Sequence, residues 1–265
     1  MKNFIFICLF ITFIAPFSVL AQEATLKPTN WHLHSPKFKD QVPKTWQAHN
    51  TLKLGGVITA GNSENITLDA SESLTLRKGL FTDKLNAGAV FSRSQVNGAS
   101  QTTAQYFFAN NQTEYLFYKK WYWQTGLGWL TDQLNGLDHK IQAMTGIGNY
   151  FIETDSIVFK AGGGYTYDKE FRIAPDNDQS IHSATLGYLF SWQINEHVSL
   201  RHISEGFFNL EVVEDVRFNT LAEIKANLIE HLSLALTSNF RFDNQPVTGF
   251  KKWDFAQTAS VVLDF

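Results

Sequence analysis

From about residue 49 to the last residue, the sequence is a series of short segments in which apolar and polar side chains alternate. About twelve such segments follow one another, each roughly 10 to 13 residues long, the length that a tilted strand needs to cross a membrane. Near the end of the chain, Leu234 and Leu236 share one parity, and Ser233 and Thr237 share the other. Successive side chains of a β-strand point to opposite faces, so the pattern predicts strands with one apolar face. The chain is therefore expected to adopt an all-β fold.

The connections between these segments alternate in length. Tight turns such as "KK", "NEH" and "IEH" alternate with longer polar stretches such as "KEFRIAPDNDQ" and "NQPVTGFKK". Short turns at one rim, longer loops at the other and an even number of strands are typical of outer-membrane barrels. We therefore predict a transmembrane antiparallel up-and-down β-barrel of about 12 strands, with its apolar faces outward. The alternative is a soluble barrel in which these faces are reversed.

The first residues have the layout of an export signal. Lys2 precedes an apolar run that ends before Pro16. We predict a secretory signal peptide over residues 1–21, a proline-containing periplasmic arm over residues 22–48 and an outer-membrane barrel over residues 49–265. The alternative is a retained membrane anchor, but the run is shorter than the roughly 20 residues of a spanning helix.

The composition narrows the classes of ligand and partner. Cys8 is the only cysteine and lies in the predicted signal peptide, so the mature chain is expected to have no disulfide and no cysteine metal site. The formal net charge is −3, without the basic excess of a nucleic-acid-binding protein. We expect no cofactor. The expected partners are outer-membrane lipid and lipopolysaccharide, the barrel-assembly machinery, and small solutes or ions.

The last seven residues, "ASVVLDF", form an alternating strand that ends in phenylalanine. Val261, Leu263 and Phe265 lie on one face, and an exposed edge of this kind would invite aggregation unless another strand paired with it. We interpret these three residues as a C-terminal signal for the outer-membrane assembly machinery. We also predict that the last strand pairs with the first and closes the barrel.

Charged residues on the polar parity are candidates for the wall of an aqueous lumen. These candidates are Asp69, Arg77, Asp132, Lys140, Lys160, Asp168, Arg217, Glu223, Lys225, Arg241 and Asp254. A ring of one sign would select ions strongly, whereas both signs occur here. The mixed set fits either an ion-paired structural wall or a weakly selective aqueous path.

Seven glycines share inward parity on four successive predicted strands. This glycine wall consists of Gly126, Gly128, Gly146, Gly148, Gly162, Gly164 and Gly187. One interpretation is that missing side chains leave room for a solute or for the proline-containing arm. The other is that glycine only relieves the curvature of the barrel.

The sequence offers few residues for catalysis. His32 and His34 form a His-x-His pair without an evident third metal ligand. His202 lies near Ser204 and Glu205, but neighbours in a strand point to opposite faces, which argues against a hydrolytic site. We therefore expect no enzymatic activity. The alternative is an outer-membrane barrel enzyme that hydrolyses lipid or peptide.

Glu72 conflicts with the alternating pattern. It shares parity with Leu68, Leu74 and Leu76, which predicts an outward position in an apolar wall. A β-bulge or a contact with another copy of the chain would explain it, and the sequence leaves both explanations open.

Two stretches, "GGVITAGNSENITL" and "GWLTDQLNGLDHKIQAMTGIGNYF", are similar to a known family. From about residue 52 to the terminal "LDF", the chain resembles the YdiY-like salt-induced outer membrane proteins, whose function is unknown. The matching features are the Gly-Asn after the first strand, the loop from Asp132 to Asp138 and the Gly-x-Gly motif at Gly146. Related sequences often have arginine near position 139, whereas this chain has its basic residue at Lys140.

The resemblance implies an outer-membrane barrel with a link to salt or osmotic stress, and it assigns no catalytic residues. Together with the residue pattern, it leads us to expect a porin-like protein of a Gram-negative outer membrane. Such a protein would serve as a passive path for small solutes or ions, or as a structural component of the envelope.

Overall fold

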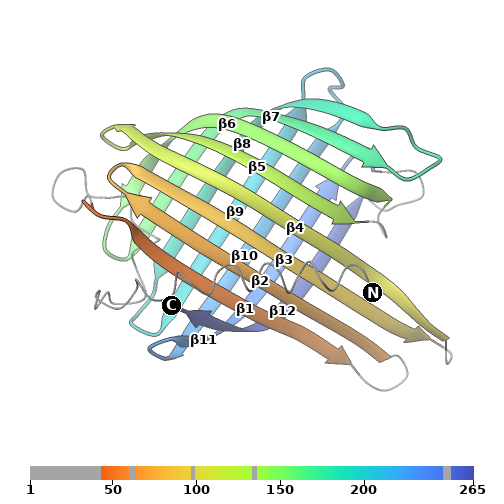
Figure 1. Ribbon diagram of the computed structural model, residues 1–265, viewed down its shortest axis with the longest axis horizontal. Coiled ribbons are helices and arrows are strands. Elements are labelled where there is room, and N and C mark those ends of the chain that lie inside the picture. The colour runs from red at the N-terminus through yellow and green to blue at the C-terminus, as the bar shows by residue number, and fades with distance from the viewer. Residues whose placement is uncertain (1–42, 60–63, 97–98, 133–135, 247–251) are drawn as a thin grey trace.

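A computed structural model describes residues 43–59, 64–96, 99–132, 136–246 and 252–265. These residues form twelve strands: β1 (Gln47–Thr59), β2 (Glu64–Lys78), β3 (Phe81–Val96), β4 (Ala99–Tyr118), β5 (Trp121–Asp132), β6 (Leu137–Glu153), β7 (Ile157–Arg172), β8 (Gln179–Gln193), β9 (Val198–Asn209), β10 (Val216–Ile229), β11 (Leu232–Asp243) and β12 (Trp253–Asp264). Each strand pairs with its neighbours in the sequence, and β1 pairs with β12 to close a barrel (Figure 1). The predicted antiparallel up-and-down barrel is confirmed. No described segment forms a helix long and apolar enough to cross a membrane.

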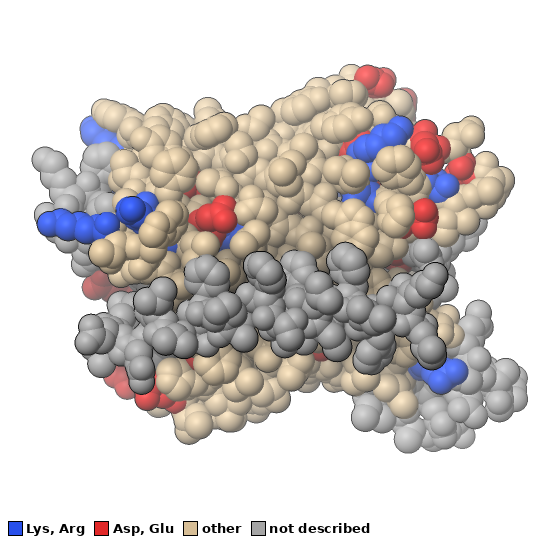
Figure 2. Space-filling view, viewed as in Figure 1, with Lys and Arg blue, Asp and Glu red and all other residues tan. Residues whose placement is uncertain are grey.

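The two faces of the strands differ as the alternation predicts. On β11, Leu234 and Leu236 are 48% and 45% exposed on the outer wall, whereas the inward Ser233 and Thr237 are 2% and 3% exposed. Figure 2 shows that most of the visible outer wall is uncharged. An apolar outer wall around a polar interior is the arrangement of barrels that lie in lipid, so the reversed, soluble arrangement is not the one adopted.

The barrel closes between β1 and β12. Thr51 pairs with Asp264 and Gly55 with Ser260 across this seam. At its end, the amide of Asn50 donates to the carbonyl of Phe265 at 2.9 Å, and the amide of Phe265 donates back at 2.8 Å. The last residue of the chain is therefore paired with the first strand, as expected, and the edge of β12 is covered.

Short connections gather at the barrel end that also holds the C-terminus (Figure 1). The turn between β2 and β3 needs only two residues, and Gly79 there has a φ of 61°, a left-handed conformation that glycine adopts without strain. The amide of Gly79 donates to the carbonyl of Pro43 at 2.9 Å. The last residues before β1 are thus attached beside this turn.

The N-terminal predictions are only partly covered by the structure. Residues 1–42 lie outside the described residues, so the signal peptide, most of the arm and the pair of His32 and His34 stay predictions. The first strand begins at Gln47, two residues before the predicted start of the barrel.

Glu72 faces outward, and the pairing of its strand excludes one of the two explanations for its position. The pairing of β2 with β1 and with β3 is continuous through Glu72 without a change of register. A bulge at this position is therefore not the cause. Its carboxylate instead accepts a hydrogen bond from the side-chain amide of Asn50 at 2.9 Å.

Candidate functional site

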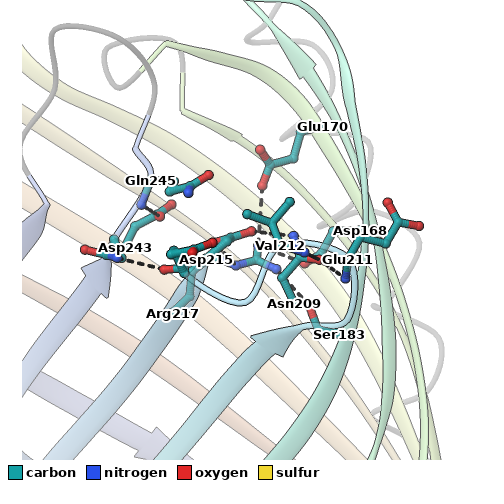
Figure 3. A network of polar contacts seen from close by, with 12 residues as sticks. Asp168, Glu170, Ser183, Asn209, Glu211, Val212, Asp215, Arg217, Asp243 and Gln245 are labelled. Carbon is teal, nitrogen blue, oxygen red and sulfur yellow. Dashed lines mark hydrogen bonds and ion pairs between the residues drawn. The ribbon is translucent and has the colours of Figure 1, made fainter.

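The inner face of the barrel carries a network of buried ionic groups toward the end with the longer loops (Figure 3). Asp168 on β7 is 0% exposed, and its carboxylate lies 3.0 Å from the guanidinium of Arg217 on β10. Arg217 also donates to the hydroxyl of Ser183 on β8 at 3.1 Å. Since β7 and β10 are three strands apart, Arg217 reaches across β8 and β9 to the acidic wall.

The same network continues to β6. The ammonium of Lys140 lies 3.2 Å from Asp168 and 3.3 Å from Glu170. Arg172 pairs with Glu170 at 2.7 Å, so each of these buried carboxylates has more than one cation beside it. Burying charges is costly unless they are paired, and this wall is paired throughout. Three of the predicted lumen residues, Lys140, Asp168 and Arg217, therefore meet in one cluster.

Arg241 on β11 joins opposite walls of the barrel. Its guanidinium lies 4.0 Å from the carboxylate of Asp132 on β5 and 5.0 Å from the ring centroid of Tyr106 on β4. In the twelve-stranded ring, β5 and β11 are six strands apart in either direction. The contact consequently crosses the lumen and narrows it near the end with the longer loops.

Glu114 on β4 is the centre of another network, near the short turns. Lys160 on β7 pairs with the Glu114 carboxylate, and the hydroxyl of Tyr150 on β6 donates to the same group. Tyr150 also belongs to a buried apolar cluster with Leu116, Tyr122 and Val158. Because these side chains face inward, they fill part of the lumen on the side of β4 to β7.

Glu223 on β10 lies between cations from two other strands. Lys53 on β1 approaches its carboxylate at 2.7 Å, and Arg201 on β9 approaches it at 3.3 Å. The hydroxyl of Thr237 on β11 donates to it at 3.2 Å. The Lys53 contact joins β1 to β10 over the two strands that lie between them, so it braces the wall beside the seam.

Lys225 and Asp264 form a further pair at the seam. The Lys225 ammonium lies 2.9 Å from the Asp264 carboxylate, which also accepts the hydroxyl of Thr51 at 2.7 Å. His49 stands 3.5 Å from the same carboxylate. The predicted lumen residue Lys225 is therefore held by a carboxylate.

Three other predicted lumen residues complete the inner face. Asp69 pairs in register with Gly55 and faces inward from β2, and Arg77 is buried at the end of the same strand. Asp254 lies on β12 opposite Arg241, but its side chain is outside the part that the structure describes.

Sequence reasoning missed several inward-facing charges. Among them are Lys53, Lys84, Glu114, Glu170 and Arg201. On β4 the reason is visible, because Glu114 shares its inner face with Tyr106 and Phe108, and these aromatic residues obscure the alternation. Counting every ionisable residue by strand parity would have found them.

Water reaches part of the interior. Asn110 on β4, Gly164 on β7, Asn219 on β10 and Ala256 on β12 face inward, yet each is exposed. The ionic networks and the apolar cluster therefore do not occupy the whole lumen.

The seven predicted wall glycines all lie on the inner face of β5 to β8. Gly148 pairs with Gly162 and Gly146 with Gly164, so glycines of neighbouring strands stand side by side. The space over Gly148 is already taken by the ring of Tyr122, because a Cβ added there would lie 2.3 Å from it. The wall thus contains close contacts between glycine backbones and, at Gly128, one open position.

His202, which was considered for catalysis, lies on the outer wall. His202 and Ser204 are two residues apart on β9, so they share the outer face, contrary to the expectation that neighbours separate them; only Glu205 faces inward. The His202 ring stacks on Tyr188 with centroids 5.5 Å apart, and Ser204 lies 3.1 Å from the hydroxyl of Thr220. No His, Asp or Glu group able to hold a metal ion occurs among the described residues.

Solved structures similar to the chain are barrels of low sequence identity. The NanC porin is 7% identical, with a TM-score of 0.47, covering 81% of this chain and 97% of its own. The translocator domain of the autotransporter NalP from Neisseria meningitidis is 12% identical, with a TM-score of 0.43, covering 83% and 88%. An anion-selective porin from Comamonas acidovorans is 10% identical, with a TM-score of 0.37, covering 83% of this chain and 99% of its own.

No curated protein matches the chain in sequence. Residues 52–265 match the family described as "Protein of unknown function, DUF481". Because this match spans most of the chain, from the first strand of the barrel to the last residue, the chain belongs to the DUF481 family.

Proposed function

We propose that the chain is an outer-membrane β-barrel of a Gram-negative envelope and that its lumen is a narrow passive path for small solutes or ions. The observation that carries this proposal is an apolar outer wall combined with inward polar groups, Asn110 and Asn219, that stay exposed to water. An apolar wall belongs in lipid, and passage needs a wetted polar interior. The proposal involves lipid, lipopolysaccharide and the assembly machinery as partners, and no catalytic step.

A structural envelope component is the second candidate. The buried cluster of Asp168, Glu170 and Arg217 favours it, because such pairing braces a wall whether or not solutes pass. The two functions differ in whether the folded barrel conducts.

Conductance in planar bilayers tests the passive path. The refolded mature protein should give stepwise currents, and Arg241→Gln should raise the unit conductance, because it shortens the side chain that crosses the lumen toward Asp132. Arg93→Gln is the matched control, since Arg93 is an exposed arginine on the outward parity of β3. Silent bilayers with protein that is folded and inserted would reject the path and leave the structural barrel.

Export and stress have separate tests. If residues 1–21 are a cleaved signal peptide, the mature protein should begin at Gln22. N-terminal sequencing of the protein from the membrane fraction tests this. The link to salt or osmotic stress comes from the family resemblance. If this link holds, a strain without the protein should grow more slowly at high salt, and complementation should restore its growth.

A further inference from the structure

On the outward faces of β7 and β8, two strands that the structure describes completely, Lys169 is the only Lys, Arg, Asp or Glu. It pairs in register with Ile141 of β6, which is 48% exposed on the outer wall, and with Ser180 of β8. Its ammonium donates to the Ser180 hydroxyl at 3.4 Å and lies 5.6 Å from the ring centroid of Phe171. Among the described residues, no carboxylate lies within ion-pair distance of it. This cation on an apolar wall therefore lacks a countercharge.

Hydroxyl and aromatic groups surround the Lys169 ammonium. The Ser180 hydroxyl, which is exposed, also accepts from the hydroxyl of Tyr167 at 3.3 Å. Because this oxygen accepts from both neighbours, its own O–H remains available as a donor. The ring of Tyr167 lies 5.0 Å from the ring of His182, whose Nδ1 is hydrogen-bonded to the hydroxyl of Tyr165. We call Tyr167, Lys169, Ser180 and His182 the Lys169 patch.

The Lys169 patch lies at the edge of the apolar wall, toward the longer loops. Lys169 is three residues before the end of β7, and Ser180 is the second residue of β8. Leu186, six residues farther along β8, is 61% exposed in the apolar part of the wall. Aromatic side chains beside a lysine are typical of the level of the lipid headgroups. In outer-membrane barrels, the end with the longer loops faces outward, so the patch is placed at the outer leaflet.

Carboxylates on the adjoining segments have other partners. Asp138 on β6 lies 3.4 Å from the ring of the neighbouring histidine, and Asp178 accepts a backbone amide at the end of β7 at 3.1 Å. Asp176, in the connection between β7 and β8, also has an interaction partner. Glu170 faces inward and pairs with the arginine two residues later. None of the four supplies the countercharge of Lys169.

We propose that the Lys169 patch binds a phosphate group of an outer-leaflet lipid, the class to which lipopolysaccharide belongs. The inference rests on the outer-membrane location proposed above and goes beyond it, because it names the residues that hold one lipid. The ammonium of Lys169 and the O–H of Ser180 are donors, and phosphate oxygens accept from both. The phosphate supplies the missing countercharge at headgroup level, while the apolar wall beside it contacts the acyl chains.

Native mass spectrometry of the refolded mature protein in detergent, with diphosphoryl lipid A added, tests the site. Wild type should retain lipid A, and Lys169→Gln should bind it about tenfold more weakly, because a charged donor to the phosphate is lost. Lys169→Arg, which keeps the charge, should retain binding. Lys119→Gln is the matched control and should bind like wild type. Lys119 is also an exposed lysine near an aromatic ring, 5.1 Å from that of Tyr118, but it lies in a short turn at the opposite end of the barrel.

Two further additions identify which part of the lipid is recognised. Lipid A without its phosphates should bind wild type only as weakly as diphosphoryl lipid A binds Lys169→Gln. Inorganic phosphate at the same concentration should not displace diphosphoryl lipid A, because a free anion lacks the acyl chains that bind the apolar wall.

The possible outcomes separate this site from the proposed function. Equal retention of diphosphoryl lipid A by wild type and Lys169→Gln, both folded as judged by heat-dependent migration in gels, overturns the site. Equal retention of lipid A with and without phosphates also overturns it, and displacement by inorganic phosphate overturns the lipid as the ligand. The measurement requires no current, so failure of the passive path leaves the site standing. Fractionation of the cell envelope tests the outer-membrane location separately.

Discussion

At the scale of single residues, glycine sets how closely neighbouring strands approach. A Cβ at Gly162 would lie 2.6 Å from the carbonyl oxygen of Ile147 and 2.9 Å from the Cα of Gly148. Both are backbone atoms of the paired strand β6, which cannot move aside without disturbing the hydrogen-bond ladder. At Gly128, by contrast, the nearest atom would be the Cβ of Gln142 at 3.7 Å, an ordinary contact. Close packing of the strands therefore explains why position 162 is glycine. Of these two glycines, only Gly128 leaves open space on the lumen side.

The two glycines should therefore respond differently to the same change. Gly162→Ala is expected to lower the free energy of unfolding by about 1–3 kcal/mol, because the added methyl overpacks the backbone. Gly128→Ala should change it by less than about 0.5 kcal/mol. Urea unfolding in lipid vesicles, followed by tryptophan fluorescence, measures both. Equal effects would mean that backbone contact is not the reason for glycine in this wall.

At the scale of elements, β12 closes the barrel while the side chain of the residue after it stays exposed. Its inward residues Ser260, Val262 and Asp264 are buried, whereas Phe265 is 62% exposed on the outer side. The described hydrogen bonds of Phe265 are made by its backbone, with Asn50. The Phe265 side chain thus adds little to the closure of the seam, and we propose that its exposed aromatic ring is the part of the chain that the assembly machinery contacts.

Phe265→Ser should separate assembly from stability. In cells, the amount of heat-resistant, membrane-inserted barrel is expected to fall, because the aromatic end of the assembly signal is lost. After refolding in vitro, the unfolding midpoint should match that of wild type, since the backbone pairing with Asn50 remains. Val213→Ser, at an exposed apolar residue outside the strands, is the control and should assemble normally. Normal cellular levels of the Phe265→Ser barrel would make "ASVVLDF" an ordinary strand.

At the scale of the whole molecule, the barrel has apolar side chains outside and polar side chains inside, the reverse of a soluble protein. This distribution determines the solvent in which the barrel is stable. The outer wall is apolar along the strands, and most of the ionic groups on the described strands face the lumen, where carboxylates and cations pair across one to six strands. Such a molecule cannot bury its outer wall by folding alone. It needs lipid around it, and its interior needs water or ion pairs.

A charge on the outer wall should be costly only where lipid surrounds it. Leu186→Arg, at a residue 61% exposed on β8, should lower the free energy of unfolding in lipid vesicles by about 2–4 kcal/mol if it lies near the middle of the bilayer. Leu210→Arg is the matched control, because Leu210 is 59% exposed but lies in the connection after β9, where an arginine meets water. Similar costs at both positions would contradict an outer wall in lipid.

The alternation of side chains was sufficient to predict most of the fold. The number of strands, the outward and inward faces and the pairing of Phe265 with the first strand follow from a two-residue period and a strand that needs a partner. These are local properties, because each strand shows its period independently of where its neighbours lie. Glu114 was missed for the same reason, since Tyr106 and Phe108 on its inner face obscure the local period.

The sequence by itself determined the strands and their faces, and only the tertiary structure decided which inward groups meet. Parity places Arg241 and Asp132 in the lumen, but it does not reveal that the Arg241 guanidinium reaches the Asp132 carboxylate. This pair joins strands on opposite sides of a closed ring, far apart in the chain. Their distance depends on how the whole barrel closes, and a local period carries no information about what stands across a lumen.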